Sequence, residues 1–276
     1  MTAVLNCNIS FIGGGNMAQA LIGGLIARGV PATRITVADP VEKIREILEE
    51  KQLTTTDNNA EAIQHADIVV LAVKPQVLAA VLKPLQGLFD GKLIISIVAG
   101  AEIATIADLT GSNRIVRVMP NTPALVETGA HGLYANDNVN IADRDLASQV
   151  LASTGLTIWV NTEAQVDAVT AVSGSGPAYF FYMMESMIRA GQNLGLDEKT
   201  ATELTLQTAL GAAQMAINSA NSPAQLRKNV TSPNGTTQAA LEVFDRAQIS
   251  QNIQTALAAA HKRSQELALE LSENSK

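Results

Sequence analysis

Short apolar runs separated by helical patterns fill the first 160 residues of the chain. Runs rich in Ile, Val and Leu lie at 8–12, 34–39, 66–73, 92–100 and 113–120. The run at 66–73 is too apolar to alternate between a buried and a solvated side, which is typical of a parallel strand covered on both faces. Strands that alternate with helices in this way predict a doubly wound, mostly parallel α/β sheet.

The pattern changes after a last strand-like segment at 155–160. From Glu163 onward the periodicity is helical and no segment resembles a strand. Helices are expected at 163–172, 177–194, 197–218, 223–229, 236–246 and 249–270. We therefore predict an α/β domain over 1–162 and an all-α domain over 163–276. No linker composition marks the boundary, so the two parts are expected to pack tightly.

Composition and charge narrow the classes of partner. The 276 residues are 47% hydrophobic and carry a formal net charge of −7. An acidic chain disfavours nucleic acid and anionic membranes, because both attract basic surfaces. No apolar stretch reaches the roughly 18 residues of a membrane span.

Cys7 is the one cysteine in the sequence, so no internal disulfide can form. With no recognisable signal peptide, a cytoplasmic location is expected.

A glycine-rich turn follows the first strand. The segment 11–25 contains Gly13-x-Gly15-x-x-Ala18 between a strand and a helix. In such a motif the first glycine allows a tight turn, the second admits a pyrophosphate and the third small residue lets helix and strand pack closely. The motif predicts a Rossmann-like dinucleotide-binding domain. The alternative, a glycine turn without a ligand, is the weaker interpretation because strand, turn and helix occur in the required order.

Asp39 ends the second strand and has two interpretations. An acidic residue there usually binds the hydroxyls of the adenosine ribose, which favours NAD over NADP. It can equally cap the helix expected at 40–51, where Pro40 is near the first position. The sequence leaves the two open.

Three further turns follow predicted strands, at the edge where such sheets bind ligands. They are 71–76, 96–100 and the stiff, polar segment 117–126. Lys74 in the first can meet a phosphate or simply precede a helix that begins at Pro75. Farther on, Ser-Gly-Ser-Gly at 173–176 is expected to interrupt a helix and admit a flat ring. The consecutive aromatics 179–182 are better explained by core or subunit packing.

The segment 227–244 is a loop of small polar residues that leads into a helix. If Thr236 or Thr237 begins that helix, its free N–H groups can bind a compact carboxylate. Ser232 and both threonines add hydroxyl groups. The alternative is ordinary Ser/Thr capping of the helix. No metal-ligand spacing and no nucleophile motif is present elsewhere in the sequence.

Five motifs together resemble the pyrroline-5-carboxylate reductase family. They are FIGGGNMA, LAVKP, RVMPNTP, AVSGSGPAY and VTSPNGTT, in the family's order and spacing. The resemblance implies NADPH-dependent reduction of the cyclic imine 1-pyrroline-5-carboxylate to L-proline, the last step of proline biosynthesis, with NADH as a possible cofactor. It also implies a helical domain that dimerises by interlocking helices, and in some members a pentamer of dimers.

The resemblance also implies site residues by position. The substrate contacts would be Glu163, Ser232, Gly235, Thr236 and Thr237, with Thr237 as the catalytic residue near the ring nitrogen. Cofactor contacts would be Ile12, Gly13, Gly14, Gly15, Asn16, Met17, Asp39, Asn59, Ala72, Val73, Lys74, Pro75, Val98, Ala99, Gly100 and Asn229. Asp39 departs from the Ser, Thr or Arg of members that prefer NADPH, which leaves the cofactor preference open.

Two other classes share part of this plan. A β-hydroxyacid dehydrogenase would need a lysine on the helix that follows the Ser-Gly-Ser-Gly segment, and 177–194 contains none. A non-catalytic nucleotide sensor, or a reductase acting on a deazaflavin, would leave the helical part and its polar loop unexplained.

Overall fold

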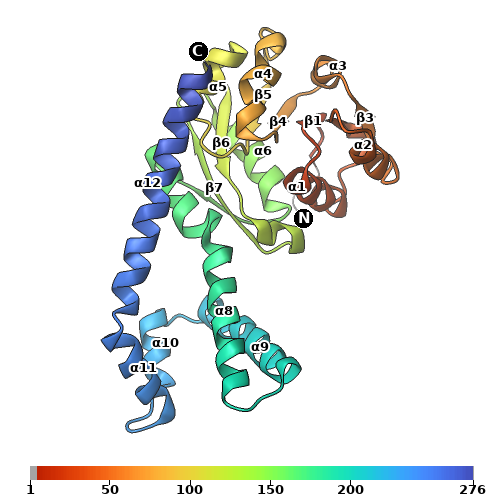
Figure 1. Ribbon diagram of the computed structural model, residues 1–276. Coiled ribbons are helices and arrows are strands. Elements are labelled where there is room, and N and C mark those ends of the chain that lie inside the picture. The colour runs from red at the N-terminus through yellow and green to blue at the C-terminus, as the bar shows by residue number, and fades with distance from the viewer. Residues whose placement is uncertain (1–4, 276) are drawn as a thin grey trace. The chain divides into compact units, whose positions relative to one another are not determined.

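The computed structural model describes residues 5–275. One eight-stranded sheet with the strand order β3-β2-β1-β4-β5-β6-β7-β8 carries the N-terminal part of the chain (Figure 1). The strands are β1 (Ile9–Ile12), β2 (Ile35–Ala38), β3 (Thr54–Thr56), β4 (Ile68–Leu71), β5 (Leu93–Ser96), β6 (Ile115–Met119), β7 (Gly129–Ala135) and β8 (Gly155–Trp159). Of the described pairs, β6–β7 is antiparallel and the others are parallel, so the predicted doubly wound sheet is confirmed.

Two strands were not predicted, and each depends on its neighbours. Strand β3 consists of three threonines at the edge of the sheet, where it pairs only with β2 among the described strands. Strand β7 contains two glycines and a histidine, a composition that does not favour a strand. It forms because β6 pairs with it on one side and β8 on the other. Neither pairing is visible in the local sequence.

Helices cover both faces of the sheet. They are α1 (Asn16–Ala27), α2 (Glu42–Glu49), α3 (Asn59–Gln64), α4 (Leu78–Leu82), α5 (Ile103–Thr110), α6 (Ile141–Ala152) and α7 (Ala164–Val169), with short 3₁₀ turns η1 (Ala32–Arg34), η2 (Pro75–Val77), η3 (Lys83–Leu85) and η4 (Thr122–Val126). Successive strand residues enter different cores: Phe11 and Val70 pack into one, Ile12 and Val69 into the other. All four are fully buried, which explains why these strands read as continuous apolar runs.

The C-terminal helices match the expected positions closely. They are α8 (Gly176–Asn193), α9 (Glu198–Asn218), α10 (Pro223–Asn229), α11 (Thr236–Arg246) and α12 (Ile249–Ser275). The expected interruption at 173–176 is narrower than predicted, because α7 continues into a π-helical turn, η5 (Thr170–Gly174), and only Ser175 separates it from α8. Met119 packs against Gly174, where a Cβ would lie 2.5 Å from the methionine Cε.

The chain divides into two compact units. Residues up to Ser175 pack with those from Ala260 onward, and Gly176–Ala259 form the second unit. Because the units are defined by contacts between residues, α7 and the C-terminal part of α12 belong to the same unit as the sheet. In this part of α12, Ser264, Ala268 and Leu271 are buried. The sequence-based division at 162/163 remains a prediction. Within residues 5–275, no helix combines the length and hydrophobicity needed to cross a membrane.

A buried histidine should make the stability of the fold depend on pH. His131 on β7 is 2% exposed, and its Nε2 lies 3.0 Å from the Thr154 hydroxyl. Burial lowers the pKa of His131 from 6.5 to about 4. Between these two values the unfolded chain binds a proton that the folded chain excludes, so acidification favours unfolding.

We expect the free energy of unfolding to fall by up to about 3 kcal/mol as the pH drops from 6.5 to 4. Urea titrations at fixed protein concentration measure this slope. His131→Gln should flatten it, whereas His65→Gln, at an exposed position, should leave it unchanged. Equal slopes in wild type and His131→Gln would contradict the assignment.

Candidate active site

The glycine-rich turn at the end of β1 depends on close backbone approach. Gly13 has φ +101°, and a Cβ there would lie 2.7 Å from the carbonyl oxygen of Ala72. Its N–H donates to the Ala38 carbonyl at 2.8 Å. Gly13 therefore joins the end of β1 to the chain leaving β4 and to β2, which any larger residue would prevent.

The next two glycines face different surroundings. A Cβ at Gly14 would strike the Ile44 side chain at 2.8 Å, whereas one at Gly15 would meet nothing within 4 Å. Gly15 is the N-cap of α1, and no side chain caps this helix. The 12-residue helix thus begins with free N–H groups beside open space, which suits a bound anion such as a pyrophosphate. Ala18 is 1% exposed, as expected for its packing role.

Asp39 is buried and already hydrogen-bonded. Its Oδ2 accepts the Gly14 N–H at 2.8 Å and its Oδ1 accepts the Val41 N–H at 2.9 Å. The expected helix start at Pro40 is wrong: α2 begins at Glu42 with Val41 as its N-cap, and Asp39 makes no capping bond to the helix. The carboxylate instead ties the glycine turn to the loop before α2. Its remaining lone pairs can still accept a ribose hydroxyl.

The other predicted cofactor residues of the sheet lie at the same edge. Strands β3, β2, β1, β4 and β5 are adjacent and parallel, so the segments that leave their carboxyl ends share one edge. These segments hold Ile12–Met17, Asp39, Asn59, Ala72–Pro75 and Val98–Gly100. Lys74 is exposed and directly precedes η2, which begins with Pro75, so it is free to meet a ligand there.

Glu163 belongs to a buried ionic cluster that the sequence did not reveal. Its Oε1 accepts the Ile103 N–H at 2.7 Å and lies 3.2 Å from Nη1 of Arg117. Nη2 of Arg117 lies 3.3 Å from Oδ1 of Asp167, which also accepts the Ser264 hydroxyl at 2.8 Å. The one available signal was an arginine inside an otherwise apolar strand, because a buried charge needs a partner.

The polar loop before α11 lies in the second unit. Gly235 is the N-cap of α11, and no side chain makes a capping bond to the helix. Ser232, Thr236 and Thr237 are exposed, so ordinary hydroxyl capping does not explain them. Asn234, with φ +57°, turns the chain, and its N–H donates to Gln238 Oε1 at 2.8 Å. The first N–H groups of this 11-residue helix remain free for an anion.

Asn229, the remaining predicted cofactor residue, is the last residue of α10. Its side-chain oxygen accepts a hydrogen bond from Gln225 Nε2 at 2.8 Å. Asn229 and the polar loop belong to the second unit, whereas Glu163 and the sheet edge belong to the first. The sequence-predicted residues therefore fall into two groups with their own local geometry.

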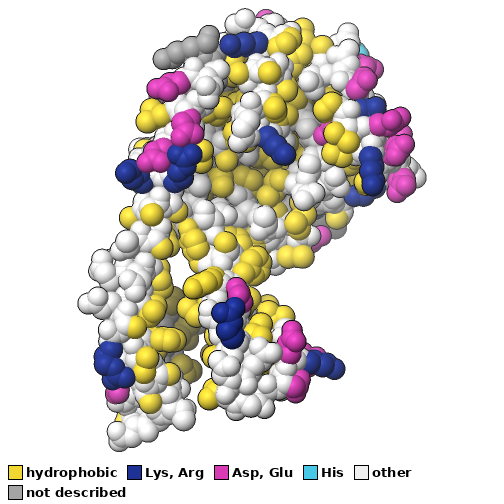
Figure 2. Space-filling model, viewed as in Figure 1, with side chains coloured by type: hydrophobic (Ala, Val, Ile, Leu, Met, Phe, Trp, Pro, Cys, Tyr) yellow, Lys and Arg dark blue, Asp and Glu magenta, His cyan; other side chains and the backbone are white. Residues whose placement is uncertain are grey.

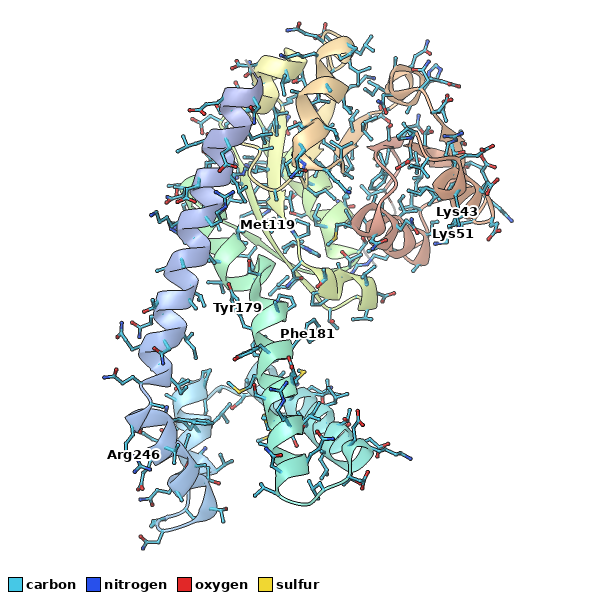
Figure 3. All side chains as sticks on the ribbon, viewed as in Figure 1. Lys43, Lys51, Met119, Tyr179, Phe181 and Arg246 are labelled. Atoms are coloured by element: carbon cyan, nitrogen blue, oxygen red, sulfur yellow. The ribbon has the colours of Figure 1, made fainter. Side chains whose placement is uncertain are left out.

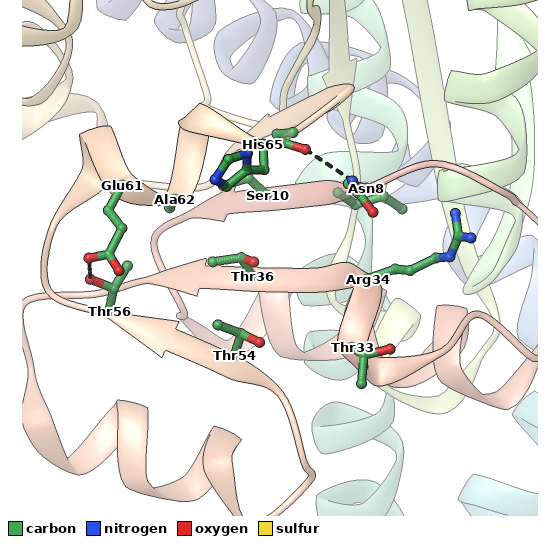
Figure 4. Close-up of a pocket in the computed structure, with 12 residues that line it drawn as sticks. Asn8, Ser10, Thr33, Arg34, Thr36, Thr54, Thr56, Glu61, Ala62 and His65 are labelled. Atoms are coloured by element: carbon green, nitrogen blue, oxygen red, sulfur yellow. Dashed lines mark hydrogen bonds between the residues drawn. The ribbon is translucent and has the colours of Figure 1, made fainter.

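A separate cavity of about 270 Å³ lies on the face of the sheet near β1, β2 and β3 (Figure 4). Ser10, Thr36 and Thr54 stand in register across these strands and line it, and the Ser10 hydroxyl is buried without a partner. Arg34, Glu61 and His65 also line it, so its charges are mixed and favour no one class of ligand. None of the predicted site residues lies in its wall.

The second unit has almost no core of its own. Of residues 176–259, only Gly176, Ala201 and Thr205 are buried. Large apolar side chains are exposed instead, among them Phe180, Phe181 and Tyr182 on α8. Figure 2 shows hydrophobic side chains on the surface of these helices, and Figure 3 labels Phe181. Helices that expose this much apolar surface need a protein partner to cover it. Phe180, Phe181 and Tyr182 thus do not form a core within this chain, whereas Tyr179 is partly buried.

Among residues 5–275, no group of three His, Cys, Asp or Glu side chains is placed to hold a metal ion. The groups assembled here are hydrogen-bond donors from the backbone, hydroxyls and a partly exposed carboxylate. Such an arrangement can bind phosphates at one place and a small carboxylate at another.

Two family models match different parts of the chain. Residues 163–267 match the family described as "Pyrroline-5-carboxylate reductase dimerisation", which supports homo-oligomerisation through the helical part. Residues 8–100 match the family described as "NADP oxidoreductase coenzyme F420-dependent". The second match lies within the α/β part of the chain alone.

Curated relatives and solved structures cover almost the whole chain. A pyrroline-5-carboxylate reductase of Pseudomonas aeruginosa is 52% identical over 95% of this chain and 97% of its own length. A pyrroline-5-carboxylate reductase structure from Coxiella burnetii has a TM-score of 0.91 at 42% identity, covering 96% of this chain and 99% of that one. A Plasmodium falciparum pyrroline carboxylate reductase with NADP bound has a TM-score of 0.86 at 32% identity, covering 96% of this chain and 100% of that one. The chain therefore belongs to the pyrroline-5-carboxylate reductase family.

Proposed function

We propose that this protein reduces 1-pyrroline-5-carboxylate to L-proline with NADPH or NADH, the last step of proline biosynthesis. The observation that carries the proposal is the 52% identity to a named reductase over 95% of the chain. The chemistry of the site supports it independently: one chain combines a dinucleotide-type glycine turn with a separate helix N-terminus suited to a carboxylate.

The residues at the sheet edge fit a nicotinamide dinucleotide. Gly13 allows the turn, Gly15 leaves room for the phosphates, and the free N–H groups of α1 face that room. When bound, the reduced cofactor supplies a hydride for the imine carbon. We assign the binding to Ile12–Met17, Asp39, Asn59, Ala72–Pro75, Val98–Gly100 and Asn229. Open space beside Gly15 and an uncapped helix are what a pyrophosphate needs.

The loop before α11 would hold the substrate. The N–H groups of Thr236 and Thr237 bind its carboxylate beside Gly235, whose own N–H donates to the Ser232 carbonyl at 3.0 Å, and the Ser232 hydroxyl adds a donor. The Thr237 hydroxyl would then hydrogen-bond the ring nitrogen and support protonation of the imine. Protonation makes the imine carbon a better hydride acceptor. The proton comes either from Thr237 or from water. Glu163 contributes its Oε2, which accepts no hydrogen bond from residues 5–275.

The exposed apolar helices support an assembly of at least two chains. We propose a homodimer built through 163–276, with a pentamer of dimers as the larger assembly that the family resemblance implies. We also propose a cytoplasmic location, with the imino acid and the cofactor as partners and no nucleic acid or membrane. The acidic net charge of −7 is consistent with this set.

The first prediction tests the activity itself. The purified protein should oxidise NADPH or NADH only when 1-pyrroline-5-carboxylate is present, and proline should form in equal amount. Absorbance at the nicotinamide band and amino-acid analysis measure the two products. Rapid reduction of 2-keto or 3-keto acids, with no turnover of the cyclic imine, would overturn the proposal.

The second prediction separates the two roles of Asp39. If its charge repels the 2′-phosphate, Asp39→Ser should lower the KM for NADPH relative to NADH by roughly three- to tenfold. Asp39→Asn retains an acceptor for a backbone N–H and removes the charge, so it should shift the ratio in the same direction. A carboxylate that only organises the glycine turn would instead weaken both cofactors together, leaving the ratio unchanged.

The third prediction concerns the polar loop. Thr237→Ala should lower kcat by roughly 10²-fold while cofactor binding stays the same, because the hydroxyl acts mainly in the transition state. Ser232→Ala should mainly raise the KM for the imino acid, by about tenfold, because it loses a hydrogen bond to a charged group. Steady-state kinetics of both variants provide the measurement, and wild-type values in both would remove the loop from the site.

A further inference from the structure

The buried cluster around Arg117 holds more negative than positive charge. Arg117 is 2% exposed and contacts two carboxylates, Glu163 and Asp167. No other Lys or Arg within the described chain forms an ion pair with either carboxylate. One cation and two anions leave a net charge of −1 in a region with little water. Burying the charges of Arg117 and Asp167 is costly, and apolar side chains of similar size would often stabilise a fold as well.

Two carboxylate oxygens of the cluster, Oδ2 of Asp167 and Oε2 of Glu163, accept no hydrogen bond from residues 5–275, and of these two side chains Glu163 is the more exposed. Asp167 is 6% exposed on its side chain, and its Oδ1 is shared by Arg117 and Ser264. Glu163 is 27% exposed on its side chain, and its Oε1 is shared by Arg117 and the Ile103 N–H. The Oε2 of Glu163 accepts no hydrogen bond from residues 5–275. The partly exposed oxygen of Glu163 is therefore the point where the cluster can meet a cationic N–H.

We propose that Arg117 is a positioning residue that holds the Glu163 carboxylate in place, so that its Oε2 can meet the protonated ring nitrogen of the substrate. Asp167 and Ser264 support Arg117 from the other side. The inference rests on the proposed function, because it deepens the role given there to Glu163. Glu163 neither takes nor gives a proton: its oxygen accepts a hydrogen bond from the iminium N–H and stabilises the positive charge.

The arrangement has a chemical consequence for ligand choice. An iminium ion and the ammonium form of proline both offer a cationic N–H to Oε2. A ring of the same shape with oxygen in place of nitrogen offers only lone pairs, which the carboxylate repels. The cluster thus selects for a ring nitrogen over a ring oxygen, and both ligands carry the same carboxylate.

A purely structural role of Arg117 is the competing explanation. The cluster connects β6, α7, α12 and the start of α5, so its loss can loosen the first unit. Such loosening would lower the binding affinity of two ligands to a similar degree if both have the same size and carry the same carboxylate. The ratio of two affinities therefore distinguishes positioning from scaffolding.

The test uses the full-length protein with L-proline and tetrahydrofuran-2-carboxylate as competing ligands against 1-pyrroline-5-carboxylate. Arg117→Met should weaken proline by tenfold or more while the oxygen analogue changes less than about threefold. Arg117→Lys keeps the charge but contacts fewer acceptors, and should recover part of the proline affinity. Glu163→Gln, at a partly exposed position, should reproduce the loss of selectivity even if Arg117→Met does not fold.

Arg114 offers a matched control. Its guanidinium forms a two-nitrogen pair with Asp143, with Nη2 2.6 Å from Oδ1, and within residues 5–275 it forms no hydrogen bond or ion pair with Glu163. Arg114→Met should leave the ratio of the two affinities unchanged. Equal weakening of both ligands in Arg117→Met or in Glu163→Gln, or no change in either ligand, would overturn the inference. If the wild type turns over the imine but the ratio does not move, only this inference fails; without wild-type turnover the proposed function fails.

Discussion

The backbone contact at Gly13 is the constraint on which the edge of the sheet depends. Its positive φ and the missing Cβ bring the end of β1 against the Ala72 carbonyl, while its N–H reaches the Ala38 carbonyl. Three strands thereby end together, and the next residue, Gly14, donates to Asp39. The open space at Gly15 and the uncapped start of α1 follow from this geometry. Anion binding there needs no cationic side chain, which suits a chain that is acidic overall.

Charge inside the first unit is arranged differently from charge at its surface. Exposed ion pairs such as Lys262–Glu266 contribute little, because water screens them. The Arg117 cluster is buried and joins elements that are far apart in the chain, so each of its groups depends on the others. Its geometry leaves one oxygen of Glu163 available. Because the Glu163 carboxylate also accepts a hydrogen bond from the Ile103 N–H, the fold holds it in place. It therefore has little rotational freedom to lose when a ligand binds.

The positions of the helices in the second unit can be predicted from the sequence of one chain, but the role of their exposed side chains cannot. Its helices occur where the periodicity predicts them, and α10 and α11 begin and end at the expected residues, 223–229 and 236–246. Proline at the start of α10 and glycine before α11 explain this accuracy, because both act locally. The exposed aromatics of α8 have no explanation within one chain. They require the homo-oligomer that the matching dimerisation family indicates.

The sequence by itself determined the elements whose causes are local: the apolar strands, the glycine turn, the helix starts and the polar loop before α11. Tertiary structure decided what depends on distant partners. Strand β7 exists because β6 and β8 pair with it, and Asp39 binds Gly14 instead of capping a helix. Arg117 pairs with Glu163, 46 residues away in the chain, and with Asp167, 50 residues away. Asp167 in turn accepts a hydrogen bond from Ser264, 97 residues further along. Such pairings follow from strand order and helix packing, which no window of neighbouring residues encodes.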